Sequence, residues 1–283
     1  MTPVRTVATL RRQLDEWRVA GDTIALVPTM GALHDGHRAL IRAARERTCR
    51  VVASLFVNPM QFAPDEDFTC YPRDEAGDIA SFLDAGVDLV YAPGTRDMYP
   101  HGFATTVTPG GAGEGLEADH RDGFFSGVAT VVLKLFMQTG ADVAVFGEKD
   151  YQQLVVVTQM VRDLDLRIDI VPVATVREAD GLAMSSRNAY LGGDDRQRAA
   201  GLFRILMETR GALDAGEPPD TAVRNAVRRL EEAFDAVDYL SLRDPVTLSA
   251  AERRAGAARL LCAVRLGGTR LIDNVAVTLP GGE

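Results

Sequence analysis

The stretch T-I-A-L-V-P-T-M-G-A-L-H-D-G-H-R (Thr23–Arg38) guides the interpretation of the whole chain. It predicts a short apolar strand over 24–27, a Pro-Thr-Met-Gly turn, and a helix whose first turn carries His34 and His37. The N-terminus of a helix presents unpaired backbone N–H groups and the positive end of the helix dipole to an anion. Histidines three residues apart lie on one helix face. The stretch therefore predicts a phosphate-binding turn.

Two other interpretations of the histidine pair are half of a zinc site and two surface histidines on an ordinary helix. The zinc interpretation lacks ligands, because Cys49, Cys70 and Cys262 are scattered and no His-Glu-x-x-His motif is present. The strand and turn before the pair favour phosphate binding over both.

The composition sets the broad class of protein. The chain has 283 residues, 46% of them hydrophobic, which is enough for a substantial core. Its net charge is −9 and its basic residues are spread out, which argues against a nucleic-acid partner. No apolar run has the length of a signal peptide core or a membrane helix, and three unpatterned cysteines suit a reducing compartment. We expect a soluble cytoplasmic protein with no membrane partner.

Lysine is almost absent from the sequence. The 31 basic residues include only Lys134 and Lys149, so arginine is used nearly everywhere else. An ammonium is a compact point charge, whereas guanidinium is a larger planar fork. A retained lysine is therefore a candidate for a position that arginine cannot fill.

Alternating strand and helix patterns predict an α/β fold. Further apolar strands are predicted at 51–57, 87–91, 142–146 and 168–173, with a short one at 105–108. Helices are predicted at 6–20, 74–85 and 126–138, with Asp74 as an N-cap. Strands that alternate with helices form a mostly parallel, doubly wound, Rossmann-like sheet. Because G-x-G-x-x-G and P-loop motifs are absent, the pattern indicates neither a nicotinamide dehydrogenase nor a P-loop kinase.

The composition changes after about residue 191. Arg- and Ala-rich helices are predicted at 195–215 and 220–236, followed by strands at 237–243, 258–266 and 270–277. We expect a Rossmann-like domain over residues 1–177 and a smaller α+β domain over residues 178–283.

Three more polar clusters follow predicted strands. They contain Asn58 and Gln61, then Gly147, Lys149, Asp150 and Gln153, and finally Met184, Ser185, Ser186 and Arg187. The carboxyl ends of parallel strands meet at one sheet edge, where such folds bind ligands. Ordinary turn and capping roles also explain each of these residues singly. For Asn58 and Gln61, the turn interpretation is as good as the ligand interpretation. Arg121, in the polar segment 93–123, is either an anion contact or an exposed arginine.

Six long motifs make the sequence resemble the pantothenate synthetase family over essentially its whole length. They are P-T-M-G-A-L-H-D-G-H (28–37), F-V-N-P-M-Q-F (56–62), Y-P-R-D (71–74), F-G-E-K-D-Y-Q-Q (146–153), R-E-A-D-G-L-A-M-S-S-R-N (177–188) and R-L-I-D-N (270–274). The His-x-Gly-His and Met-Ser-Ser-Arg elements also resemble signatures of the nucleotidylyltransferase superfamily.

The resemblance implies an ATP-dependent ligase that joins pantoate to β-alanine through an enzyme-bound pantoyl adenylate, with release of AMP and pyrophosphate. The implied catalytic residues are His34, His37, Lys149, Ser185, Ser186 and Arg187. The implied ATP-binding residues are Met30, His37, Gly147, Lys149, Asp150, Val176, Met184, Ser185, Ser186 and Arg187. The implied pantoate-binding residues are Gln61, Gln153, Asn58, Met30, Phe62 and Tyr71.

The family also implies Mg²⁺ held mainly by phosphate oxygens, a homodimer, and a C-terminal domain that closes over the site. Asp78 is a possible metal ligand, although Gly77 replaces one acid of a pair that some members carry. Phe124 stands where the family often has histidine, so any role of that histidine is absent. The alternative functions are a nucleotidylyltransferase acting on a cofactor precursor, which would not require Gln61 and Gln153, and a nucleotide sensor without turnover.

Overall fold

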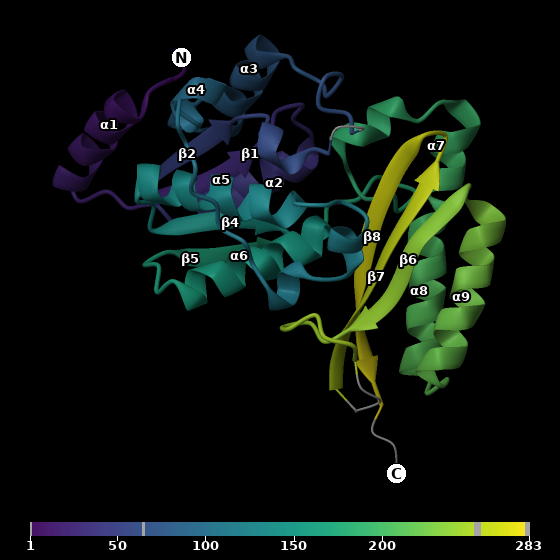
Figure 1. Cartoon of the computed structure of the whole chain (residues 1–283). Helices are drawn as coiled ribbons and strands as arrows, with labels where there is room; N and C mark the ends of the chain where they lie inside the picture. The colour runs from purple at the N-terminus through teal and green to yellow at the C-terminus, as the bar shows by residue number, and fades with distance from the viewer. Residues whose placement is uncertain (1, 64–65, 252–255, 281–283) are drawn as a thin grey trace.

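The computed structural model describes residues 2–63, 66–251 and 256–280. These residues form a five-stranded parallel sheet and a three-stranded antiparallel sheet, which lie beside each other in Figure 1. The parallel strands are β1 (Ile24–Thr29), β2 (Arg50–Leu55), β3 (Leu89–Tyr91), β4 (Val143–Gly147) and β5 (Asp169–Val173). The predicted α/β class with a smaller α+β part is confirmed.

The parallel sheet has the strand order β3-β2-β1-β4-β5. Every neighbouring pair is parallel, and the direction of winding reverses between β1 and β4. At such a switch point the loops after the two strands diverge, which opens a crevice at their carboxyl ends. The Met30–His37 segment follows β1 and the Glu148–Asp150 segment follows β4, so both predicted clusters reach this crevice.

Helices cover both faces of the parallel sheet because alternate strand residues point to opposite sides. One core layer joins Leu26 of β1 to α1 (Val7–Val19), α5 (Phe124–Thr139) and α6 (Tyr151–Asp163). The other joins Val27 to α2 (Asp35–Arg45) and α3 (Glu75–Ala85). The short helix α4 (Thr95–Met98) follows β3. Among the described residues, no helix has the length and apolar character needed to cross a membrane.

The antiparallel sheet has the order β6-β7-β8. Its strands are β6 (Ala236–Arg243), β7 (Gly256–Leu266) and β8 (Thr269–Leu279), and the helices beside it are α7 (Gly193–Ala199), α8 (Gly201–Asp214) and α9 (Pro219–Ala233). One face packs on α8 and α9, and the other contacts α6 through Leu261 and Tyr239 (Figure 1). The antiparallel sheet therefore lies between its own helices and the parallel-sheet part.

Two details of the sequence prediction are wrong. Residues 105–108 form no strand; the Val107 amide instead donates to Thr130 Oγ1 of α5 at 2.9 Å, so this segment lies along the helix. The helix predicted over 195–215 is two helices that break at Ala200, next to Gly201, a residue of low helix propensity. The division at residue 178 stays a prediction.

Candidate active site

The four polar clusters meet in a cavity of about 230 Å³ at the carboxyl ends of β1 and β4, which we call the sheet-edge cavity. The predicted residues that line it are Met30, His34, His37, Asn58, Gln61, Tyr71, Gly147, Lys149, Asp150, Gln153, Val176, Met184, Ser185, Ser186 and Arg187. Phe62 is the exception. Its ring packs edge-on against Phe68 and Tyr71, so it contacts Tyr71, a lining residue, instead of lining the cavity itself.

The histidine turn, residues 31–37, connects β1 to α2. His34 is the N-cap of α2, and its Nδ1 accepts the Gly36 amide at 3.1 Å. His37 reaches back, and its Nδ1 accepts the His34 amide at 3.3 Å. The two rings therefore form a reciprocal capping box, with imidazole nitrogens in place of the usual hydroxyl and carboxylate oxygens.

The capping box also fixes the chemistry of the two rings. A ring nitrogen that accepts a hydrogen bond carries no proton, so each neutral imidazole must carry its proton on Nε2. Burial lowers the pKa of His34 to about 4, with Lys149 acting in the same direction. Burial, together with His34, lowers the pKa of His37 to about 3. Both histidines are therefore neutral Nε2–H donors at physiological pH.

Asp78 shapes the start of the histidine turn. Its carboxylate accepts the amides of Ala32 at 3.1 Å and Leu33 at 3.0 Å, and the side chain is buried. A Cβ at Gly31, where φ is +91°, would lie 2.5 Å from an Asp78 oxygen, so only glycine fits. Both Asp78 oxygens thus serve the backbone, and the metal role of this residue stays a prediction.

The lysine turn, residues 147–150, connects β4 to α6 through the 3₁₀ helix η4 (Glu148–Asp150). Lys149 lies in the sheet-edge cavity, where its Nζ is 3.6 Å from Asp150 Oδ1. Asp150 is the N-cap of α6 but makes no side-chain cap hydrogen bond. The turn therefore presents a cation and a carboxylate side by side, without support from a local cap.

The Ser-Ser-Arg cluster, residues 185–187, is hydrogen-bonded to two other segments of the chain, the histidine turn and the segment of Asp67. Ser185 caps the 3₁₀ helix η5 (Ser186–Tyr190) by accepting the Arg187 amide at 3.3 Å. The Ser186 hydroxyl donates to the Ala32 carbonyl in the histidine turn at 2.9 Å. Arg187 forms a bidentate pair with Asp67, at 2.8 and 2.9 Å. The cluster therefore lies against the start of the histidine turn, where Ser186 contacts Ala32.

The apolar end of the cavity holds Asn58, Gln61 and Met30, three of the predicted pantoate residues. Gln61 follows Asn58 on the 3₁₀ helix η1 (Pro59–Gln61), and Asn58 Nδ2 donates to Gln61 Oε1 at 3.1 Å. The Gln61 amide nitrogen lies 3.0 Å from the Met30 sulfur. The hydroxyl of Tyr99, a residue that the sequence interpretation missed, donates to Asn58 Oδ1 at 2.7 Å. This end therefore combines amide groups with the apolar face of α5, whose lining residues are Val128, Val131, Val132 and Leu135.

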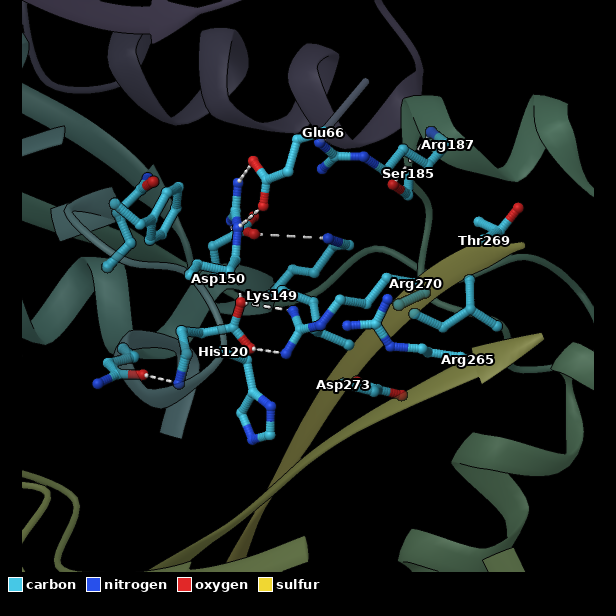
Figure 2. Close-up of a pocket in the computed structure, with 18 of the residues that line it drawn as sticks. Glu66, His120, Lys149, Asp150, Ser185, Arg187, Arg265, Thr269, Arg270 and Asp273 are labelled. Carbon is cyan, nitrogen blue, oxygen red and sulfur yellow. Dashed lines mark hydrogen bonds and ion pairs between the residues drawn. The ribbon is translucent and has the colours of Figure 1, made fainter. Parts of the chain in front are cut away.

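A second cavity of about 420 Å³ lies between the two sheets and shares Lys149, Asp150 and Arg187 with the first. Figure 2 shows how charged side chains from both parts of the chain converge on this inter-sheet cavity. Arg121 is paired with Glu66 at 2.5 and 2.8 Å and packs over the Phe124 ring, so it is not an exposed arginine, and its role as an anion contact stays a prediction.

Sequence reasoning missed the two carboxylates that neutralise these arginines. Glu66 and Asp67 lie four and five residues after the end of the F-V-N-P-M-Q-F motif and pair with Arg121 and Arg187. Those partners hold the pKa of both carboxyl groups below the usual range, although burial acts in the opposite direction. An acidic pair just beyond a site motif was the available signal.

A crevice at a sheet switch point, neutral imidazole donors at a helix N-terminus, and a lysine and an arginine that line the same cavity define an α/β enzyme that binds a nucleotide or another phosphate compound. The sequence profile of the Pantoate-beta-alanine ligase family matches residues 2–276. The chain belongs to this family. Membership confirms the resemblance seen in the sequence, and with it the prediction of an ATP-dependent ligase.

Individual relatives agree over nearly the full length. Pantothenate synthetase from Rhizorhabdus wittichii is 52% identical over 98% of this chain and 99% of its own. The crystal structure of pantothenate synthetase from Thermus thermophilus has a TM-score of 0.92 at 46% identity, covering 97% of this chain and 99% of its own. A pantoate-beta-alanine ligase from Francisella tularensis, solved with beta-gamma ATP and beta-alanine, has a TM-score of 0.81 at 31% identity, covering 97% of each chain.

Proposed function

We propose that the sheet-edge cavity carries out the ligation of pantoate to β-alanine, with the residue roles given below. In the first step a pantoate carboxylate oxygen attacks the α-phosphorus of ATP, and pyrophosphate leaves. In the second step the β-alanine amine attacks the acyl carbon of the pantoyl adenylate, and AMP leaves. The observation that carries this proposal is that four clusters, dispersed along the sequence, line one cavity.

His34 and His37 would donate their Nε2–H groups to phosphate oxygens. Preorganised donors stabilise charge that develops in the transition state, because no reorganisation is needed when the reaction occurs. The capping box supports this role, since it points the protonated nitrogens away from the helix backbone. Lys149, Ser185, Ser186 and Arg187 would hold the remaining phosphate charge, with Met30, Gly147, Asp150, Val176 and Met184 around the nucleoside.

For Arg187, phosphate binding would replace one anion by another. Its guanidinium already holds the Asp67 carboxylate in the bidentate geometry that phosphate also accepts. Pantoate would lie at the apolar end, where Gln61 and Gln153 supply amide groups and Met30 and Tyr71 supply apolar contact. Asn58 would hold Gln61 in place through their hydrogen bond. Phe62 would act only through Tyr71.

Mg²⁺ would accompany ATP and neutralise phosphate charge. The described residues include no group of three or more histidine, cysteine or acidic side chains that could hold a metal ion by themselves. Asp150 is the one carboxylate among the implied ATP-binding residues. This donor set supports an ion held mainly by phosphate oxygens.

We further propose a cytoplasmic homodimer, which rests on the family resemblance. A sedimentation experiment at micromolar concentration tests the dimer. A single species near 30.6 kDa would contradict it.

The chemistry is tested by incubating the protein with ATP, Mg²⁺, pantoate and β-alanine while AMP and pyrophosphate are followed. Pyrophosphate release that needs pantoate, and AMP release that needs β-alanine, support the ligase. A nucleotide retained on the product would indicate a nucleotidylyltransferase instead. Nucleotide binding without turnover would indicate a sensor.

A further inference from the structure

The motif R-L-I-D-N (270–274) has no role in the proposed reaction. It lies on β8, and its polar side chains reach from the antiparallel sheet to the rest of the molecule. Arg270 pairs with Glu117 at 2.6 and 2.8 Å, and Asp273 pairs with Arg177 at 2.7 and 2.9 Å. The third polar residue, Asn274, contacts the lysine turn.

Asn274 holds the backbone of the lysine turn. Its Nδ2 donates to the carbonyl of Glu148 at 2.9 Å and to the carbonyl of Lys149 at 3.0 Å. Its Oδ1 accepts from Arg259 Nε at 2.7 Å. Both ends of the carboxamide are therefore in use, and this network fixes its orientation, since a reversed amide would put oxygen against two carbonyl oxygens.

Arg259 holds Asn274 in place. It lies on β7, is 9% exposed, and stacks over the Tyr151 ring at 4.0 Å. The same guanidinium donates to the Glu148 carboxylate at 3.0 Å. Asn274 and Arg259 of the antiparallel sheet therefore hold the lysine turn at the carbonyls of Glu148 and Lys149 and at the Glu148 side chain.

The lysine turn needs this support. A three-residue 3₁₀ helix has poor hydrogen-bond geometry, and Asp150 gives the following helix no side-chain cap. The direction of the Lys149 side chain follows from the backbone dihedrals of the turn, which Asn274 constrains at adjacent peptides.

We propose that Asn274 is a positioning residue for phosphate binding: it fixes the backbone of Glu148 and Lys149 and so aims Lys149 into the sheet-edge cavity. This inference rests on the proposed role of Lys149. Under this proposal, part of the antiparallel sheet supports the site by binding main-chain carbonyls of the lysine turn, and it does not contact the substrate.

The sharpest test is Asn274→Asp, which keeps the shape and the bond to Arg259 but removes both donors. The dissociation constant of ATP, measured calorimetrically without pantoate, should rise roughly tenfold, which is about 1.4 kcal/mol. In a Lys149→Ala background the same substitution should change it by less than about twofold, because groups that act as a unit are not additive. Asn274→Ala, which adds no charge, provides a second variant.

Asp273→Asn is the matched control. It makes the reverse change at the neighbouring position and weakens the pair with Arg177, without touching either carbonyl. Its Oδ1 can still accept the Asn274 amide, as Asp273 Oδ1 does at 2.7 Å. If Asp273→Asn changes the ATP dissociation constant, the fold change should be the same with Lys149 present or absent. General loosening of the contact between the sheets would behave in this way.

Hydrogen exchange of residues 146–151 in the ligand-free protein gives a readout that does not depend on ATP. Exchange there should become faster in both Asn274 variants and stay unchanged in Asp273→Asn. The inference is overturned if Asn274→Asp acts equally in both backgrounds, or if the turn exchanges at the parental rate. If Lys149→Ala itself leaves ATP binding unchanged, the role proposed for Lys149 fails, and the inference fails with it for that separate reason.

Discussion

The histidine turn and the lysine turn lie on opposite sides of the same crevice, but they are held in different ways. The end of the histidine turn is closed by its own side chains, since each ring accepts an amide within three residues, while Asp78 and Ser186 hold the start of the turn. The lysine turn is held from outside by Asn274, whose hydrogen bonds span 125 and 126 residues of sequence. The helix cap at the histidine turn is thus encoded locally, whereas the lysine turn has no side-chain cap and depends on the second sheet.

This difference determines whether a single mutation can separate stability from phosphate binding. In the histidine turn the same rings cap a helix and present donors, so truncation removes both functions. In the lysine turn the side chain in the cavity and the group that fixes the backbone belong to different residues. Stability and phosphate binding can therefore be altered independently there.

The largest effect is expected at Lys149. Lys149→Ala should reduce pantoate-dependent pyrophosphate release about 10³-fold, in line with the loss of a preorganised electrostatic group. Lys149→Arg should be nearly as damaging, because the guanidinium fork is bulkier and directs its donors differently. The thermal midpoint should stay near that of the parent, since the local fold does not rest on this side chain. Near-normal adenylation in Lys149→Arg would reduce the residue to a general positive charge.

The histidine turn should show the opposite coupling. His34→Ala and His37→Ala should each lose about 2 to 4 kcal/mol of transition-state stabilisation, as for removal of one oxyanion donor. Each should also lose about 1 kcal/mol of stability, because the reciprocal cap is broken. Adenylation rates and urea denaturation measure the two effects.

Two substitutions separate capping from catalysis in this turn. His34→Asn keeps a good N-cap, and His37→Gln keeps a side chain that can reach the N-cap amide. Both should restore stability while leaving adenylation low. Activity within about tenfold of the parent, or roughly 1.4 kcal/mol, would contradict a catalytic role for that histidine.

A smaller effect is expected in the pH dependence of stability. The pKa of His34 falls from 6.5 to about 4 on folding, and that of His37 falls to about 3. Between these values and 6.5 the unfolded chain binds more protons than the folded chain, so the free energy of unfolding falls as pH falls through this window. Urea denaturation at about pH 7.5 and about pH 5 should show a smaller decline in the variant that combines His34→Asn with His37→Gln. An equal decline would contradict the burial of neutral imidazoles.

The smallest effect is expected at Lys134, the other lysine. Its Nζ lies 4.8 Å from the centre of the Phe103 ring and 6.0 Å from that of Tyr99, outside the lining of both cavities. Arginine makes the same cation–π contact, so Lys134→Arg should leave the rate of adenylation unchanged and stability within about 0.5 kcal/mol. A large loss of activity would show that scarcity of lysine does not distinguish the two positions.

The elements that the sequence predicted best are those with strong local patterns. The β1 strand, the helix that carries His37 in its first turn and the Asp74 cap of α3 follow from apolar runs and capping residues, and the structure contains each of them. His34, which was expected in the first turn of that helix, is its N-cap. The strand expected at 105–108 failed because four alternating residues carry little pattern, and a contact with α5 decides their path. Phe62 was misplaced because its position in a motif does not reveal which way its ring turns.

The sequence by itself determined the order of the main strands and helices, the family, and a histidine turn at the start of a helix. Tertiary structure alone decided that Glu66 and Asp67 neutralise the two cavity arginines. It alone also brought Asn274 to the lysine turn. The physical reason is the range of the interactions: caps and periodicity act between neighbours in the chain, whereas ion pairs and carbonyl contacts between the sheets form only after both sheets have packed.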